Sequence, residues 1–346
     1  MPFEQAGDQN KIRISQYHQL REYIFSLAGQ VQKEKKRLDI GSREELLAWQ
    51  QVNRPVLERL LGFPAPVPEY EPQLISDVEI GSDELVKSIR RMTIRVAEGL
   101  DVYGILLMPH KEKPRLMLCF HGGSGCPELV TSVCPSANYN DGARKFVELG
   151  FAVFAPLLVL RREEADPDWP EAYRAGLHMN ALWAGTSVMA IEVEKIRRAI
   201  RFFKGYDAVD ASRVGVAGLS YGGYYALYTA ALLEEIAFSV SSCYVNDRLD
   251  VMRAKPGDLL DWQYPMQGAR FSDADLAALI CPRPLYVEAG QKDELLGIEG
   301  AKREAEKMRG VYEGAGAGEK FFFDPFEGTH EFNLGHIREF FEKNIF

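Results

Sequence analysis

The sequence lacks any segment that could anchor it in a membrane or direct its export. Its apolar runs all fall short of the ~18 consecutive apolar residues that a membrane-spanning helix needs. Its first residues, Met1-Pro-Phe-Glu-Gln-Ala-Gly-Asp8, contain neither the basic start nor the apolar stretch of a secretory signal. We therefore expect a cytoplasmic protein without a membrane partner. A secreted form would be a processed one that had already lost its signal.

Cysteine is scarce, and the sequence contains no C-x-x-C pair. An odd number of five cysteines argues against a disulfide framework and favours a reducing compartment. Cys119 and Cys243 fall in apolar runs and are interpreted as small core residues. Cys126 and Cys134 flank a loop near a glycine-rich segment; we expect them to be unpaired, and the sequence leaves open whether they are reactive or bridged. Histidine and aspartate pairs at metal-ligand spacing are missing, so we expect no metal site.

Basic residues are outnumbered, with 41 against 50 acidic ones and a net charge of −9 at pH 7. This balance argues against nucleic acid and anionic membranes as partners. With 46% hydrophobic and 26% charged residues, the 346-residue chain has the composition of a globular protein with a large core. The composition leaves a homo-oligomer open. No internal repeat is visible.

The first 70 residues predict a helical extension. Apolar residues recur at helical spacing at Leu20, Ile24, Leu27 and Val31. A capping box at Ser42-Arg-Glu-Glu45 starts a second helix, and Pro55 is expected to start a short third one. Four prolines between positions 63 and 72 indicate a linker. We predict an extension over 1–70 that packs on a catalytic domain over 71–346.

The remainder of the chain predicts an α/β fold. Alternating residues from Met92 to Val96, a turn at Glu98-Gly99 and a returning run from Val102 indicate an antiparallel hairpin. Strand and helix patterns then alternate, and a long amphipathic helix runs from Met189 to Phe203. This order predicts a mostly parallel central sheet, with antiparallel strands first and helices on both faces.

The most informative motif is Gly218-Leu-Ser-Tyr-Gly222, a G-x-S-x-G pattern. An apolar run precedes it, and a helix pattern rich in small residues follows it. A serine at such a sharp strand-to-helix turn stands clear of the backbone, and the glycines let strand and helix approach closely. Ser220 is therefore the predicted nucleophile of a serine hydrolase.

Three other predicted strands end in residues that complete this chemistry. His121-Gly-Gly123 follows the strand before the serine, and Asp293 and His330 follow two strands after it. Oxyanion loop, serine, acid and histidine thus occur in the order that hydrolases on an open α/β sheet use. We expect the amides of Gly123 and Tyr221 to bind the oxyanion.

Several residues compete for the role of the acid. Glu288 lies within a predicted strand, Glu294 adjoins Asp293, and Asp247 is interpreted as a turn cap. We favour Asp293 because it lies in the loop three residues past Gly290. A further histidine, His121, is expected to hold the oxyanion loop rather than to catalyse.

Together these motifs resemble α/β-hydrolases of the acetyl xylan esterase and dienelactone hydrolase group. The resemblance runs from about Ile75 to the C-terminus and rests on His121-Gly-Gly, Gly218-Leu-Ser-Tyr-Gly-Gly-Tyr, the stretch 273–285 and Phe326-Glu-Gly-Thr-His-Glu-Phe. The Ser-Tyr-Gly-Gly-Tyr portion is also similar to prolyl oligopeptidases. Thr329 departs from the pattern, because relatives often carry a second glycine there. The resemblance implies ester hydrolysis without a cofactor.

Two insertions after predicted strands, 157–183 and 246–267, are expected to overhang the serine. They supply the predicted substrate-binding residues, which are His178, Trp183, Trp262 and Tyr264, and also include Trp169. These aromatics would contact a sugar or aryl ring, or else only close the pocket rim. We expect a serine esterase acting on short acyl esters of a carbohydrate or other small molecule. The alternatives are a serine peptidase of the prolyl oligopeptidase type and a non-catalytic binding protein.

Overall fold

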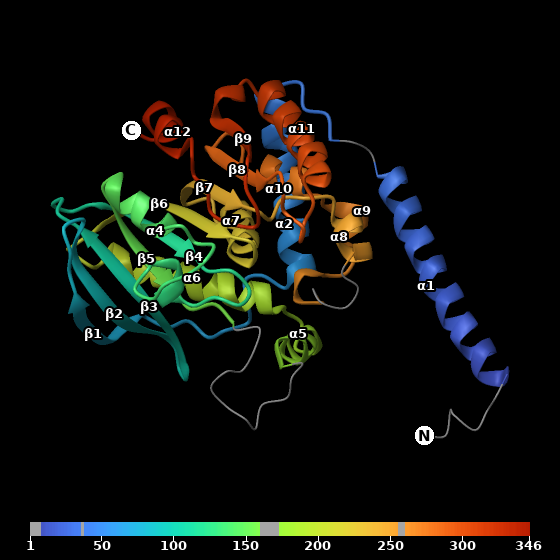
Figure 1. Cartoon of the computed structure of the whole chain (residues 1–346), viewed down its shortest axis with the longest axis horizontal. Coiled ribbons are helices and arrows are strands. Elements are labelled where there is room, and N and C mark those ends of the chain that lie inside the picture. The colour runs from blue at the N-terminus through green and yellow to red at the C-terminus, as the bar shows by residue number, and fades with distance from the viewer. Residues whose placement is uncertain (1–7, 36–37, 160–172, 255–259) are drawn as a thin grey trace.

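The structure is a computed structural model of the whole chain and describes residues 8–35, 38–159, 173–254 and 260–346. Its centre is a mixed sheet, and the described part contributes nine strands in the order β1-β2-β3-β5-β4-β6-β7-β8-β9 (Figure 1). The strands are β1 (Gln73–Gly81), β2 (Val86–Ala97), β3 (Leu100–Pro109), β4 (Arg115–Phe120), β5 (Phe151–Pro156), β6 (Asp210–Leu219), β7 (Ile236–Ser242), β8 (Leu285–Gly290) and β9 (Phe321–Phe326).

The sheet is antiparallel at its beginning and parallel from β5 to β9. Strands β1, β2, β3 and β5 pair antiparallel, whereas β5-β4-β6-β7-β8-β9 pair parallel. This confirms the fold predicted from the alternating pattern. The chain passes from β4 to β5 on one side and then to β6 on the other, so the strand order reverses at β4. Such a reversal opens a crevice at the carboxyl ends of the flanking strands.

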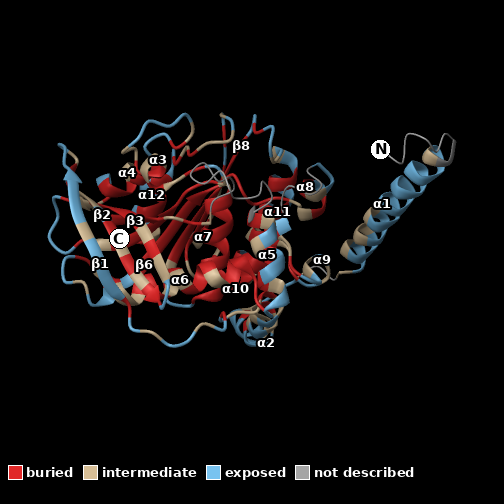
Figure 2. Ribbon diagram, turned by 90° about the horizontal axis from the view of Figure 1, so that it is seen from below, coloured by how far each residue is buried: buried red, intermediate tan, exposed pale blue. Residues whose placement is uncertain are grey.

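Helices cover both faces of the sheet. The described α-helices are α1 (Asp8–Glu34), α2 (Arg43–Leu61), α3 (Pro127–Val130), α4 (Gly142–Glu148), α5 (Tyr173–Trp183), α6 (Val188–Lys204), α7 (Tyr221–Leu232), α8 (Arg248–Ala254), α9 (Gln267–Arg270), α10 (Asp273–Ile280), α11 (Ile298–Gly314) and α12 (Ile337–Asn344), of which α1 lies apart from the sheet. Strand β4 supplies Leu116 and Leu118 to one core cluster and Met117 and Cys119 to the other. Because alternate side chains point to opposite faces, central strands such as β4, β5 and β8 are buried on both sides, whereas the edge strand β1 is exposed (Figure 2).

The expectation of a separate helix starting at Pro55 is wrong. Helix α2 begins after its predicted cap, Ser42, whose Oγ accepts a hydrogen bond from the Glu45 amide at 3.1 Å, and it continues through Pro55. Proline removes one helical donor. Tertiary contacts on both sides of it offset that loss, since Arg54 donates to the Leu279 carbonyl at 2.9 Å and Leu57 is fully buried.

Helix α1 projects away from the rest of the molecule (Figure 1). Its C-terminal end meets the core where Gln32 donates to Asp247 at 3.0 Å and Lys35 forms an ion pair with Asp275. Most of its large apolar side chains are exposed, namely Ile12, Ile14, Tyr17, Leu20, Tyr23, Ile24, Leu27 and Val31. The division at residue 70 and a homo-oligomer both stay predictions. Among the described helices, none is long and apolar enough to cross a bilayer.

Candidate active site

Ser220 lies at the sharp turn between β6 and α7. Its backbone angles are φ 58° and ψ −113°, a conformation that residues other than glycine rarely adopt. The Ser220 amide donates to the Ser242 carbonyl at 2.8 Å, and its carbonyl accepts from the Tyr224 amide at 2.9 Å. These bonds link the strained turn to β7 on one side and to α7 on the other.

Glycine is required on both sides of this turn because the backbones almost touch. A Cβ at Gly218 would lie 2.2 Å from the carbonyl carbon of Gly222, and a Cβ at Gly222 would lie 2.2 Å from the Phe120 carbonyl oxygen. Neither contact is possible without moving backbone. The close approach packs α7 against the carboxyl end of β4, where the glycine-rich loop begins.

Asp293 and His330 meet at the carboxyl ends of β8 and β9. The Nδ1 atom of His330 lies 2.7 Å from Oδ2 of Asp293, and Oδ1 of Asp293 accepts from the amides of Leu295 and Leu296 at 2.8 and 3.1 Å. Burial acts to raise the pKa of Asp293. The hydrogen bond from His330 and these amides outweigh burial, so the pKa of this carboxyl lies below its usual value. The carboxylate is thus ionised and oriented toward the imidazole.

The competing carboxylates are bonded elsewhere. Glu288 is fully buried and accepts from the Ser242 hydroxyl at 2.7 Å and from the amides of Asn333 and Leu334 at 3.0 and 2.7 Å. Burial raises the pKa of Glu288 to about 7. Glu288 therefore fastens the loop that carries His330, whereas it is Asp293 that contacts the imidazole. Asp247 accepts from the Leu249 amide at 3.0 Å, as expected for a turn cap.

The glycine-rich loop after β4 is held from two sides. The Gly122 amide donates to the Tyr139 hydroxyl at 2.7 Å. His121 is buried, with Nδ1 2.8 Å from the Gly122 carbonyl and Nε2 accepting from the Leu158 amide at 3.0 Å. Because Nε2 accepts, the proton resides on Nδ1. Burial lowers the pKa of His121 to about 4. This is the structural role predicted for that histidine.

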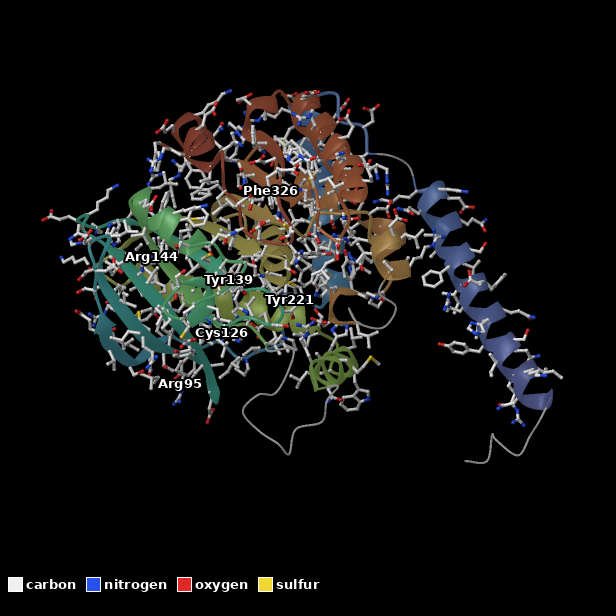
Figure 3. All side chains as sticks on the ribbon, viewed as in Figure 1. Arg95, Cys126, Tyr139, Arg144, Tyr221 and Phe326 are labelled. Atoms are coloured by element: carbon white, nitrogen blue, oxygen red, sulfur yellow. The ribbon has the colours of Figure 1, made fainter. Side chains whose placement is uncertain are left out.

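A pocket of about 440 Å³ joins these elements. Its wall contains Gly123, Ser220, Tyr221 and His330, together with Gly122, Ser124, Gly125, Leu129, Pro135, Ser136, Ala137, Asn138, Tyr139, Arg174, Leu219, Trp262, Leu295 and Leu296. Figure 3 labels two of these residues, Tyr139 and Tyr221, which come from elements far apart in the sequence. The structure thus brings the predicted nucleophile, base and oxyanion-loop residues to one cavity.

Of the four predicted substrate-binding residues, only Trp262 lines this pocket. His178 is buried within α5 and its neighbours, and Trp183 points into solvent with 93% of its surface exposed. Tyr264 lines a different cavity beside α1, where its hydroxyl lies 3.4 Å from that of Tyr228. The predicted Trp169 lies outside the described residues.

Sequence reasoning missed several pocket residues, among them the polar residues Arg174 and Tyr139. Arg174 lies within the predicted insertion 157–183, from which only histidine and tryptophan residues were selected as substrate-binding candidates. Tyr139 lies 17 residues from the glycine it binds, and no motif connects the two. A search of the insertion for charged residues as well as aromatic ones would have found Arg174.

Within the described residues, one group could hold a metal ion, formed by Cys243, Asp293 and His330, whose ligand atoms lie within 4.8 Å of one another. Its donor set is a poor fit. Burial raises the pKa of Cys243 to about 12, so its sulfur is a neutral thiol rather than a thiolate, and it donates to the Glu331 carbonyl at 3.4 Å. Nδ1 of His330 is already bonded to Asp293. The arrangement therefore suits proton transfer better than metal ligation.

The strand order and a serine at the β6–α7 turn define an α/β-hydrolase. A profile of the dienelactone hydrolase family matches residues 130–315, more than half of the chain, and the chain belongs to that family. This confirms the resemblance expected from the motifs.

Known proteins are similar to this chain in sequence or in fold. A Bacillus subtilis protein, "Putative hydrolase YtaP", is 31% identical over 121 residues, which span 34% of this chain and 40% of YtaP. Two solved structures share the fold. A putative acetyl xylan esterase from Bacteroides fragilis has a TM-score of 0.65 at 17% identity, covering 87% of this chain and 81% of that one. A glucuronoyl esterase from Solibacter usitatus has a TM-score of 0.58 at 16% identity, covering 90% and 98%.

Proposed function

We propose that this chain is a serine carboxylesterase that cleaves short acyl esters through an acyl-enzyme, with Ser220, His330 and Asp293 as catalytic residues. The observation that carries the proposal is the 2.7 Å hydrogen bond between Asp293 and His330 at the pocket whose wall also holds Ser220. An ionised carboxylate, an imidazole and a hydroxyl at one cavity are the groups that acyl transfer requires.

The reaction begins with removal of the Ser220 proton. A serine hydroxyl hardly ionises near neutral pH, so Nε2 of His330 takes its proton as Oγ attacks the ester carbonyl. Asp293 keeps the other imidazole proton on Nδ1 and stabilises the imidazolium that forms. His330 then gives its proton to the departing alcohol. Water attacks the acyl-enzyme with the same base, and Ser220 is restored when the acid leaves.

Backbone amides would stabilise the negative oxygen of each tetrahedral intermediate. The proposed donors are the amides of Gly123 in the glycine-rich loop and Tyr221 at the first position of α7. Both residues line the pocket beside Ser220. Because such donors are fixed before the reaction, losing one typically costs on the order of 3 kcal/mol of barrier. The Gly122–Tyr139 hydrogen bond and His121 support the loop that carries one of them.

The proposed substrate is an ester of a small acid on a carbohydrate or another small alcohol. The named activities of the structural neighbours, acetyl xylan esterase and glucuronoyl esterase, are both cleavages of carbohydrate-borne esters. A pocket of about 440 Å³ is at the small end of ligand sites, which suits a short acyl group. All five cysteines are free, in keeping with the expected cytoplasmic location.

The decisive experiment combines active-site labelling with a substrate panel. A fluorophosphonate should label Ser220 stoichiometrically, and Ser220→Ala should abolish both labelling and hydrolysis of p-nitrophenyl acetate. Ser212→Ala, at an exposed serine of the same strand, is the matched control and should retain both. Cleavage of aminoacyl-arylamides in preference to esters would instead indicate a peptidase. Labelling without turnover of either class would indicate a binding protein.

A further inference from the structure

Arg174 is a buried arginine in the wall of the catalytic pocket. It lies in the first turn of α5, is only 5% exposed, and lines the same cavity as Ser220 and His330. Its Nη2 atom is 3.2 Å from Oδ1 of Asp261. Its Nη1 atom is buried and has no hydrogen-bond partner among the described residues. A buried donor without an acceptor is costly, so this atom calls for an explanation.

Two other arginines, the buried Arg198 and the half-buried Arg283, show what a purely structural role looks like here. Arg198 uses Nε on Glu194 at 2.6 Å, Nη1 on the Val96 carbonyl at 2.8 Å and Nη2 on the Val67 carbonyl at 3.1 Å. Arg283 likewise bonds carbonyls through all three nitrogens. Arg174 differs from these two, because its buried Nη1 has no acceptor among the described residues. Arg248 shares that feature but lines a different cavity, whereas Arg174 lines the one that holds Ser220 and His330.

The contacts that Arg174 does make fix its position next to the nucleophile. Its Cζ lies 4.2 Å from the centre of the Tyr221 ring, and the Tyr221 hydroxyl donates to Oδ2 of Asp261 at 2.7 Å. Tyr221 directly follows Ser220 in the chain. An arginine held over this ring by an ion pair cannot swing out to solvent without leaving Asp261 buried and unpaired. The guanidinium that carries the unpartnered Nη1 is therefore held in a fixed position in the pocket wall.

We propose that Nη1 of Arg174 donates a hydrogen bond to an uncharged oxygen of the substrate, a hydroxyl or an ether close to the scissile ester. This inference rests on the proposed esterase function and narrows its substrate to oxygen-bearing esters. The charges around Arg174 favour an uncharged acceptor over a carboxylate. The Arg174–Asp261 pair is neutral as a whole, and a substrate carboxylate would add a second negative charge next to Asp261. A hydroxyl or ether satisfies the donor without that repulsion.

The test compares pairs of esters in which one oxygen replaces one methylene. The acyl pair is p-nitrophenyl methoxyacetate and p-nitrophenyl butanoate, and the alcohol pair is 2-methoxyethyl acetate and butyl acetate. The quantity is the ratio of kcat/KM within each pair, measured for the wild-type protein and for Arg174→Met. A charge-assisted hydrogen bond predicts that the ratio for at least one pair falls about tenfold or more in Arg174→Met. General damage to the site lowers kcat/KM for both esters of a pair, so its effect cancels in the ratio.

Two further variants keep the outcome interpretable. Arg174→Met with Asp261→Asn removes the unpaired carboxylate that the single variant leaves, and should show the same fall in the ratio if the fold is intact. Met179→Gln, at an exposed residue of the same helix, should leave both ratios unchanged. The proposal is overturned if neither ratio moves while the wild type hydrolyses butanoate and acetate esters. It is also overturned if only a carboxylate-bearing ester, mono-p-nitrophenyl succinate, gains from Arg174. Failure of the wild type on every ester would instead reject the proposed function.

Discussion

Nδ1 of His330 lies 2.7 Å from Oδ2 of Asp293, although 37 positions separate the two residues in the chain. Strands β8 and β9 create this contact because they pair in parallel and end at the same edge of the sheet. Ser220 follows β6, two strands away in the same parallel array. Parallel pairing therefore brings the Ser220, Asp293 and His330 motifs, which are distant in the sequence, to the same edge of the sheet.

The first prediction concerns the acid. Asp293→Asn should lower kcat by up to about 10⁴-fold, because an asparagine amide donates to Nδ1 and favours the wrong imidazole tautomer. Glu294→Gln, at the exposed neighbouring residue, is the control and should be near neutral. Steady-state hydrolysis of p-nitrophenyl acetate measures both. A silent Asp293→Asn variant would show that the acid has been misplaced.

The second prediction concerns Glu288, the carboxylate that fastens the loop after β9. Glu288→Gln should destabilise the protein by about 1–3 kcal/mol, because the glutamine amide would face a backbone N–H that now donates to the carboxylate. It should slow fluorophosphonate labelling of Ser220 about tenfold without abolishing it. Urea unfolding and labelling kinetics test this, with the exposed Glu327→Gln as control. Complete loss of labelling would assign Glu288 a direct catalytic role.

The third prediction concerns acid stability and His121. Burial lowers the pKa of His121 from 6.5 to about 4, so below pH 6.5 the unfolded chain binds a proton that the native state refuses. His121 therefore contributes stability that is present above about pH 6.5 and is lost as the pH falls through about 4. The free energy of unfolding should fall by about 3 kcal/mol through this group.

Urea unfolding at several pH values between about 4 and 7.5 measures how the free energy of unfolding changes with pH. His121→Gln retains an acceptor for the Leu158 amide but cannot titrate, so its stability should depend less on pH over this range. Equal slopes for the variant and the wild-type protein would contradict the assignment.

The fourth prediction concerns metals. The cluster of Cys243, Asp293 and His330 offers a neutral thiol and an imidazole nitrogen already bonded to a carboxylate. EDTA should therefore leave ester hydrolysis unchanged. Activity lost on chelation and restored by Zn²⁺ would show that these residues bind a metal after all.

The fifth prediction concerns the length of the acyl group. Acetyl and propionyl p-nitrophenyl esters should have higher kcat/KM than octanoyl and longer ones, because the acyl carbon must lie against Gly123 and Ser220 at the pocket wall. Each methylene that fits contributes only about 0.8 kcal/mol, whereas one that does not fit would displace the carbonyl from the proposed oxyanion donors. A series from C2 to C12 measures the preference. An optimum at C8 or beyond would indicate an open, lipase-like groove.

Some elements of the site were readable in the sequence because their signals are local. The elbow at Ser220 depends on two glycines within two positions of the serine, and the structure explains both by backbone contacts that a Cβ would block. The helix cap at Ser42 and the amphipathic pattern of α6 are equally local, and both elements occur as predicted. Pro55 was misjudged because an internal proline ends an isolated helix, while α2 is held by the core on both sides of it.

The sequence by itself determined the α/β class, the alternation of strands and helices after the antiparallel hairpin, and the Ser, Asp and His motifs, because periodicity and turn chemistry act over a few residues. Only the tertiary structure decided which carboxylate contacts His330. Asp293 and Glu288 both carry a carboxylate, but Asp293 bonds the imidazole whereas Glu288 bonds the Leu334 amide. It also placed Arg174 at the pocket and left Trp183 in solvent, although both lie on α5. Which side of a helix meets a cavity depends on how that helix packs on the sheet, and no local pattern encodes this.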